Sequence, residues 1–125
     1  MIPKFRAWDK RSKEMWKVST LHIEDEYVDL FKKNIYENPL NDPWAKFGDA
    51  ILMQSTGLKD KNGVEIFEGG IGWDDHQEVH GQVIFENGAF KYEWENISED
   101  LFEVTDDIEI VGNIYENSEL LEGTE

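Results

Sequence analysis

The residues best suited to chemistry form the segment 74–80, Asp-Asp-His-Gln-Glu-Val-His. On a helix, His76 and His80 would share one face beside carboxylates, as the ligands of a zinc site do. The order His-Gln-Glu-Val-His is neither zinc-protease pattern, because both need a Glu directly beside a His. Trp73 is expected to end one strand and Gly81 to open the next, so the segment reads as their connecting loop. We therefore predict opportunistic Zn²⁺ or Ni²⁺ binding at most, and no designed metal site.

Three other patterns fall short of a known motif. The segment 68–72, Glu-Gly-Gly-Ile-Gly, lacks the helix and the lysine that follow a phosphate-binding loop. The segment 60–63, Asp-Lys-Asn-Gly, starts like a calcium loop but has no Glu at the required downstream spacing. Asp106 and Asp107 supply half of an acid–base pair, but an acidic surface produces such neighbours by chance. We predict no catalytic residue and no cofactor, and we expect that the protein is not an enzyme.

The elements that would position these residues are mostly strands. Apolar residues alternate with polar ones, as in Phe90, Tyr92 and Trp94 against Lys91 and Glu93. Two Asn-Gly pairs, 62–63 and 87–88, favour type I′ hairpin turns. The predicted strands cover residues 4–9, 15–21, 51–54, 64–67, 71–73, 82–85, 90–94 and 108–115.

One segment has a different period. Ile23, Tyr27, Leu30 and Phe31 follow the spacing of a helical stripe. The acidic residues 24–26 open the predicted helix, and Lys32 and Lys33 close it, which complements a helix dipole. The pattern predicts one short helix near residues 24–34. The segment 38–43 contains two prolines and is expected to be a loop.

These elements define a mainly β fold, α+β at most. Short strands joined by tight glycine turns indicate a small bent sheet or an SH3-like, partly open barrel built from hairpins. A length of 125 residues predicts a single domain over 1–125, with a frayed acidic tail over 116–125.

The composition limits the compartment and the chemistry. The chain has no Cys, which excludes disulfides and thiolate sites. It has no apolar run of about 20 residues and no signal-peptide core near its N-terminus. We expect a cytoplasmic protein, in a bacterial cell or a phage-infected host, with no membrane partner.

The net charge of −16 is unevenly distributed. Residues 1–62 hold eleven Lys and Arg and ten Asp and Glu, a net charge of +1. Residues 63–125 hold one base, Lys91, and eighteen acids, a net charge of −17. The first predicted hairpin, residues 4–21, carries half of all the bases. An acidic half keeps a protein soluble, and it also suits a basic partner.

Three segments resemble the YopX family of small bacteriophage and prophage proteins. They are the segments 4–9 (Lys-Phe-Arg-Ala-Trp-Asp), 57–69 (Gly-Leu-Lys-Asp-Lys-Asn-Gly-Val-Glu-Ile-Phe-Glu-Gly) and 108–117 (Ile-Glu-Ile-Val-Gly-Asn-Ile-Tyr-Glu-Asn). Two positions depart from the family pattern: Gly70 stands where relatives usually have Asp, and Ser118 stands where they usually have Pro. The resemblance implies a phage-associated β protein and supplies no catalytic residue. Folding alone accounts for these motifs, since their glycines suit turns and bulges.

Three functions remain open. The first is a non-catalytic protein-binding or self-assembling module, with a basic partner or a second copy of the chain. The second is an acidic decoy that binds a host nucleic-acid-binding protein. The third is nucleic-acid binding through the basic hairpin and its Trp8 and Trp16, which the acidic half opposes.

Overall fold

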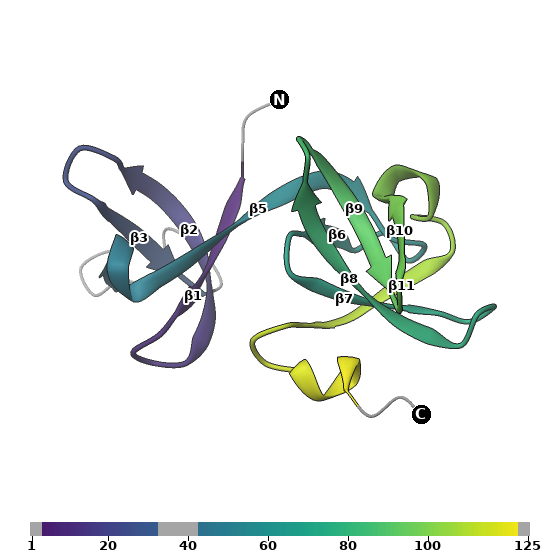
Figure 1. Cartoon of the computed structure of the whole chain (residues 1–125). Helices are drawn as coiled ribbons and strands as arrows, with labels where there is room; N and C mark the ends of the chain where they lie inside the picture. Colours follow the sequence, from purple (N-terminus) through teal and green to yellow (C-terminus); the bar gives the residue numbers. More distant parts are fainter. Residues whose placement is uncertain (1–3, 33–42, 123–125) are drawn as a thin grey trace. The chain divides into compact units, whose positions relative to one another are not determined.

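A computed structural model describes residues 4–32 and 43–122 of the chain. Its contacts divide the chain into two compact units, Met1–Gln54 (unit 1) and Ser55–Glu125 (unit 2), which are described separately (Figure 1). The predicted single domain over 1–125 stays a prediction. Most of the predicted loop at 38–43 lies outside the described residues.

Unit 1 is built from antiparallel strands in the order β4-β3-β2-β1-β5. β1 pairs with β2 and with the first half of β5, in the registers Ala7↔Trp16 and Ala7↔Leu52. A short 3-10 helix, η1, links β4 to β5. The elements are β1 (Phe5–Asp9), β2 (Glu14–His22), β3 (Tyr27–Phe31), β4 (Trp44–Lys46), η1 (Phe47–Asp49) and β5 (Ala50–Lys59).

The predicted helix near residues 24–34 is wrong over its described part. Residues 23–26 form a turn, and β3 pairs with β2 and β4 on its two sides. Val28 and Leu30 are buried, whereas Ile23, the first residue of the supposed stripe, is 74% exposed. The sequence Tyr-Val-Asp-Leu-Phe fits period 2 as well as period 3.6, and so short a helix is marginal by itself. Residues 27–31 therefore form a strand rather than a helix, because the strand gains backbone hydrogen bonds to both β2 and β4.

Unit 2 contains an open five-stranded antiparallel sheet in the order β10-β9-β8-β7-β11. The second half of β5 pairs with β6, through Ser55↔Phe67 and Lys59↔Glu65. The elements are β6 (Glu65–Phe67), β7 (Gly70–Asp74), β8 (Val79–Glu86), β9 (Ala89–Trp94), β10 (Ile97–Asp100), η2 (Leu101–Glu103), β11 (Ile108–Asn113) and η3 (Ser118–Leu121). The mainly β prediction is confirmed. Both sheets have free edges, so no closed barrel forms in the described parts of the chain.

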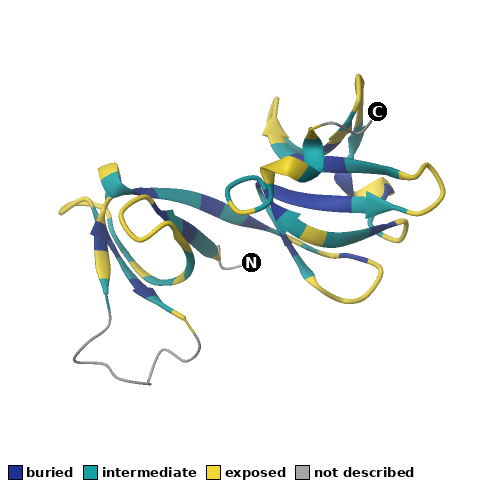
Figure 2. Ribbon diagram, turned by 90° about the horizontal axis from the view of Figure 1, so that it is seen from below, coloured by how far each residue is buried: buried dark blue, intermediate teal, exposed yellow. Residues whose placement is uncertain are grey.

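Each unit has its own apolar cluster. Ala7, Val28 and Leu30 are fully buried in unit 1, and Ile66, Val83 and Ile108 in unit 2. Figure 2 shows buried positions along the strands and exposed positions at the turns, as expected for sheets with one covered face.

A tyrosine fills the centre of the unit 2 sheet. Gly72 and Gly81 lie opposite each other on β7 and β8, and the Tyr92 ring lies over both. A Cβ on Gly81 would collide with the Tyr92 ring, and a Cβ on Gly72 would lie 2.9 Å from its hydroxyl oxygen. Tyr92 is 1% exposed, and its hydroxyl has no hydrogen-bond partner among the described residues. The paired glycines therefore make the space that the ring occupies.

The two Asn-Gly turns differ. Asn87 and Gly88 both have positive φ, 55° and 82°, as a type I′ turn requires. At Asn62-Gly63 only the glycine has a positive φ. The reason is that the Asp60 carboxylate accepts hydrogen bonds from the Asn62 and Val64 amides and holds the chain in a different type of turn. The type I′ prediction is thus wrong at Asn62-Gly63.

The segment predicted to be a frayed tail is described as far as Glu122. There it forms a turn and η3, and η3 lies against β8. The side-chain oxygen Oδ1 of Asn117 accepts a hydrogen bond from the Asn113 backbone amide at 3.1 Å, which ties the turn to the end of β11. Residues 123–125 of this predicted tail lie outside the described residues.

Candidate binding pocket

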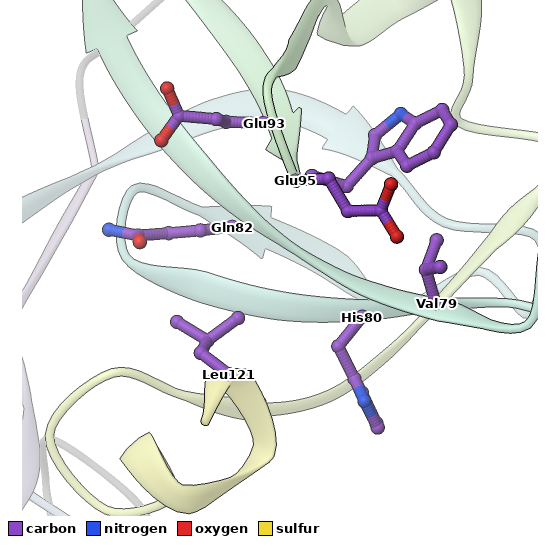
Figure 3. Close-up of a pocket in the computed structure, with 7 residues that line it drawn as sticks. Val79, His80, Gln82, Glu93, Glu95 and Leu121 are labelled. Atoms are coloured by element: carbon purple, nitrogen blue, oxygen red, sulfur yellow. The ribbon is translucent and has the colours of Figure 1, made fainter. Parts of the chain in front are cut away.

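A pocket of about 270 Å³ opens in unit 2 on the β8–β9 hairpin beside η3 (Figure 3). Its volume lies just below the ~300–1,000 Å³ typical of small-molecule sites. It therefore suits one side chain better than a cofactor. The lining residues are Val79, His80, Gln82, Glu93, Trp94, Glu95 and Leu121.

The period of the strands explains which residues reach this pocket. Gln82 and Glu93 are cross-strand partners, and each is next to a buried residue, Val83 or Tyr92, that faces the core. Because successive side chains alternate between faces, Gln82 and Glu93 project from the opposite face. Figure 3 shows them projecting in the same direction from neighbouring strands, with Leu121 of η3 beside them. The pocket is thus an outer sheet face completed by η3.

The pocket carries two carboxylates without counter-ions. No ion pair or hydrogen bond joins the Glu93 or Glu95 side chain to any described residue, and both residues are exposed. The nearest lysine along β9 is already engaged, since Lys91 Nζ donates to Asp100 Oδ1 at 2.6 Å. This hydrogen bond raises the pKa of Lys91. The pocket can therefore receive a positive charge from outside.

The imidazole of His80 stands beside an anchored tryptophan. The Trp73 and His80 ring centroids are 4.7 Å apart. Trp73 Nε1 donates to Asp75 Oδ1 at 2.5 Å, and Lys61 Nζ donates to Asp75 Oδ2 at 2.9 Å. The Lys61 hydrogen bond lowers the pKa of Asp75, and the Trp73 hydrogen bond acts in the same direction. These contacts hold the Trp73 ring in place at one side of His80.

Apolar side chains complete the lining. Val79 and Leu121 are half-buried, and Trp94, which borders the pocket, packs against the unit 2 core and donates from Nε1 to Glu99 Oε2 at 2.8 Å. Lys and Arg place an aliphatic stem on apolar surface and keep their charged head in a polar setting. The apolar residues of the pocket can contact such an aliphatic stem, and its carboxylates can contact the charged head. The lining contains no Ser, Thr or Lys that could act as a nucleophile.

The two histidines of the segment 74–80 are not brought together. His76 lies in the exposed turn 75–78, where its amide donates to Asp74 Oδ1 at 2.8 Å, whereas His80 is in β8. Only His80 reaches the pocket. Within the described ranges, no group of three or more His, Cys, Asp or Glu side chains is placed to hold a metal ion. Asp106 and Asp107 are both exposed and do not line this pocket.

The central motif builds a structural joint. Asp60 is 6% exposed, and its carboxylate accepts the amides of Asn62, Val64 and Ile110 at 2.8–2.9 Å. Burial alone would raise the pKa of the Asp60 carboxyl, but these three hydrogen bonds outweigh burial and hold the pKa below its usual range. A carboxylate engaged this way serves folding rather than a ligand.

The other two motifs contain comparable buried groups. Asp9, 4% exposed, accepts hydrogen bonds from the Arg11 amide and the Ser12 hydroxyl. Asn113, 6% exposed, accepts the amides of Tyr115 and Glu116 through Oδ1. Each of the three sequence segments thus contains one buried polar side chain that organises a turn.

Glu93, Glu95 and Leu121 were not predicted from the sequence as residues of a site. The strict alternation over residues 90–95 marks the outward carboxylates, and this signal identifies Glu93 and Glu95 as a pair on one face. Nothing in the sequence indicates that Leu121 covers them, because η3 reaches β8 only through the tertiary fold.

The fold and the pocket define a small, mainly β protein of open antiparallel sheets with a side-chain-sized acidic pocket. The family model described as "YopX protein" matches residues 4–122, and the chain belongs to the YopX family. The resemblance read from the three segments is thereby confirmed. No curated protein matches the chain.

Two solved structures match over nearly the whole chain. Protein EF1440 from Enterococcus faecalis is 33% identical, with a TM-score of 0.72, and the match covers 98% of this chain and 99% of that one. Protein YopX from Bacillus subtilis is 20% identical, with a TM-score of 0.53 and 98% coverage of both chains, and shows the fold alone. Among the described residues, no helix has the length and hydropathy needed to cross a bilayer.

Proposed function

We propose that the protein is a non-catalytic protein-binding module whose unit 2 captures a basic segment of a partner protein. The location of the charge carries this proposal. Unit 2 has three Lys against nineteen Asp and Glu, a formal charge of −16, whereas unit 1 has nine bases and nine acids. The unit boundary at 54/55 therefore assigns the whole net charge to unit 2.

The negative charge of unit 2 is only weakly neutralised by its own lysines. Two of its lysines are engaged by its own carboxylates, Lys61 by Asp75 and Lys91 by Asp100. A surface of one sign steers a partner of the opposite sign and raises the rate of encounter. The pocket then offers an anchor, with a Lys or Arg stem along Leu121 and its head at either Glu93 or Glu95, whose carboxylates point to different sides in Figure 3.

A separate partner fits these observations better than a second copy of the chain. A second copy would have to present the bases of the first hairpin, and two of these are already bonded. Lys10 Nζ donates to the Gly48 carbonyl at 3.2 Å, and Arg11 Nη2 donates to the Trp44 carbonyl at 2.7 Å. An acidic decoy for a host nucleic-acid-binding protein is one case of the same class, since such a host protein presents a basic surface.

Direct nucleic-acid binding through the first hairpin has less support. Trp16 packs against the unit 1 core, and Lys32 Nζ lies over its ring, 4.4 Å from the centroid. That ring face is therefore occupied rather than open to a nucleobase. The charge of unit 2 would also repel phosphates.

The test is a titration of the full chain with fluorescein-labelled decalysine and deca-arginine, followed by anisotropy. We compare the wild type with Glu93→Gln/Glu95→Gln and with the control Asp106→Asn/Asp107→Asn, which removes the same charge outside the pocket. Exposed ion pairs contribute about 0.2–1 kcal/mol each, so the pocket variant should weaken binding roughly 2- to 30-fold. The control should change it less than about twofold.

Salt and oligomeric state complete the test. Binding should fall steeply between about 0.05 and 0.5 M NaCl, because salt screens exposed charges. Absence of peptide binding at low salt would refute the proposal, and an equal loss in both double variants would refute the pocket as the anchor. Light scattering that finds a salt-sensitive dimer would favour a second copy as partner, and binding of labelled single-stranded DNA or RNA would favour the nucleic-acid function.

A further inference from the structure

Unit 1 contains a second depression, of about 500 Å³, formed by the turn before β3, by β4 and by η1. Two aromatic rings, Tyr27 and Trp44, and three carboxylates, Asp25, Glu26 and Asp49, line it together with Lys46. We propose that this depression is a binding site for an organic cation, an alkylammonium or guanidinium group. This proposal is independent of the function proposed for unit 2.

The two rings form an aromatic corner. The Tyr27 and Trp44 centroids are 5.6 Å apart and the ring planes meet at 72°. Trp44 is 51% exposed, so its ring is available to a ligand. The face of an aromatic ring is electronegative and attracts cations within about 6 Å of its centroid. A corner of two nearly perpendicular rings is the simplest part of the aromatic cages that bind quaternary ammonium groups.

Contacts with neighbouring residues fix the positions of the Tyr27 ring and of the strand that carries Trp44. Tyr27 stacks on His22 with centroids 4.0 Å apart and planes 13° apart, and His22 Nε2 lies 2.8 Å from Asp29 Oδ2. The strand that carries Trp44 is fixed by the ladder to β3 and by the Arg11 hydrogen bond to the Trp44 carbonyl. Binding therefore requires little ordering of these side chains, which favours affinity.

The charges select a cation over a nucleotide. Asp25, Glu26 and Asp49 oppose a single positive group, Lys46, so the depression has a formal charge of −2. The Phe47 amide donates to the Glu26 carbonyl at 2.9 Å and joins η1 to the turn before β3. This bond keeps the acidic residues of both segments around one opening. An aromatic base linked to a phosphate would meet these carboxylates, whereas an alkylammonium ion gains from both rings and carboxylates.

The experiment follows the indole N–H of Trp44 and the ring protons of Tyr27 by NMR in the full chain. The probes are choline, Nα-acetyl-lysine amide, Nα-acetyl-arginine amide and 3,3-dimethyl-1-butanol, the uncharged analogue of choline. All are titrated at constant ionic strength, set with KCl. We expect saturable shifts with the cations and none with the alcohol. Tighter binding of the amides than of choline would identify a protein side chain as the source, and the reverse would identify a free ammonium compound.

Variants locate the site. Trp44→Phe keeps a ring and should retain binding, whereas Trp44→Leu should weaken it roughly two- to fivefold, the value of one exposed cation–π contact. Asp49→Asn should weaken it by a similar factor, and Phe102→Leu, at a 65% exposed aromatic in unit 2, should have no effect. Equal binding of the alcohol and choline, or unchanged affinity in a folded Trp44→Leu variant, would overturn the proposal.

Discussion

The amide of Ile110 donates a 2.8 Å hydrogen bond to Oδ2 of Asp60, fifty residues earlier in the chain. The same carboxylate sets the turn after β5 through its other oxygen. Lys61 adds a backbone bond to the Ile108 carbonyl at 3.1 Å. The central and closing family segments are thus one structural joint, whose centre is a buried, charged acceptor.

Removal of the Asp60 carboxylate should be severely destabilising. Asp60→Ala leaves three amides without their acceptor, each a charge-assisted bond in the native state. We expect a loss of at least about 2 kcal/mol in the free energy of unfolding, measured by urea denaturation. Asp106→Ala, at an exposed turn, is the control and should stay within about 0.5 kcal/mol. A near-native Asp60→Ala variant would show that the joint is dispensable.

Acid should destabilise the protein through Asp9 and Asp60. For both carboxyls burial raises the pKa, but the hydrogen bonds that they accept dominate and leave the folded-state pKa below the ordinary value of 3.8. Their contribution is therefore complete above the unfolded pKa and is lost as the pH falls through the folded pKa. We expect the urea midpoint to be flat from pH 7 to about 5 and to fall below about pH 4.

An Asp9→Asn/Asp60→Asn variant is the matched comparison for this pH dependence. It should be less stable at pH 7 and lose less stability on acidification, so that the two curves converge at low pH. Parallel curves for the wild type and this variant would contradict the assignment to these two groups.

A methyl group at position 81 should disrupt the unit 2 sheet. The Cβ of Gly81→Ala would collide with the Tyr92 ring, and overpacking of this kind costs about 1–3 kcal/mol. The atoms nearest to this Cβ all belong to Tyr92, so the double variant Gly81→Ala/Tyr92→Leu should relieve part of the collision. A double-mutant cycle by urea denaturation should give a favourable coupling of more than about 0.5 kcal/mol. Strict additivity would place the strain elsewhere.

The Tyr92 hydroxyl should contribute little to stability. It is buried without a hydrogen-bond partner among the described residues, and burial raises its pKa. Because a buried unpaired polar group is costly, Tyr92→Phe should leave the free energy of unfolding unchanged or raise it by up to about 1 kcal/mol. Tyr92→Leu should lose about 2–4 kcal/mol through the cavity it leaves. A clear destabilisation by Tyr92→Phe would reveal a partner for the hydroxyl.

Local patterns in the sequence were sufficient for most strands. The alternation over residues 90–95 and the Asn87-Gly88 turn predicted the pairing and the turn of the β8–β9 hairpin, because both signals act between close neighbours. The start of β8 was wrong, since the strand begins at Val79, inside the predicted loop 74–80. β10 (Ile97–Asp100) was missed because its four residues carry no clear alternation, and it forms by pairing with β9. The five residues of β3 fitted two periods equally.

The candidate pockets were less accessible to sequence reasoning. His80 was singled out for its spacing from His76, yet its neighbours in the structure are Trp73 and residues of β9 and η3. The aromatic corner brings together Tyr27 and Trp44, seventeen residues apart, through pairing of β3 with β4. Contacts of this kind depend on which strands pair in the sheet, and a single sequence does not reveal that pairing.

The sequence by itself determined that this is an acidic, cysteine-free, mainly β chain of the YopX type, because composition, alternation and turn residues are local properties. Tertiary structure decided that Asp60 supports Ile110, that η3 completes an acidic pocket and that the acidic half of the sequence is a compact unit with its own core. The physical reason is that burial and long-range hydrogen bonds depend on which strands pair. Strand pairing is set by the free energy of the whole fold, not by that of any single segment.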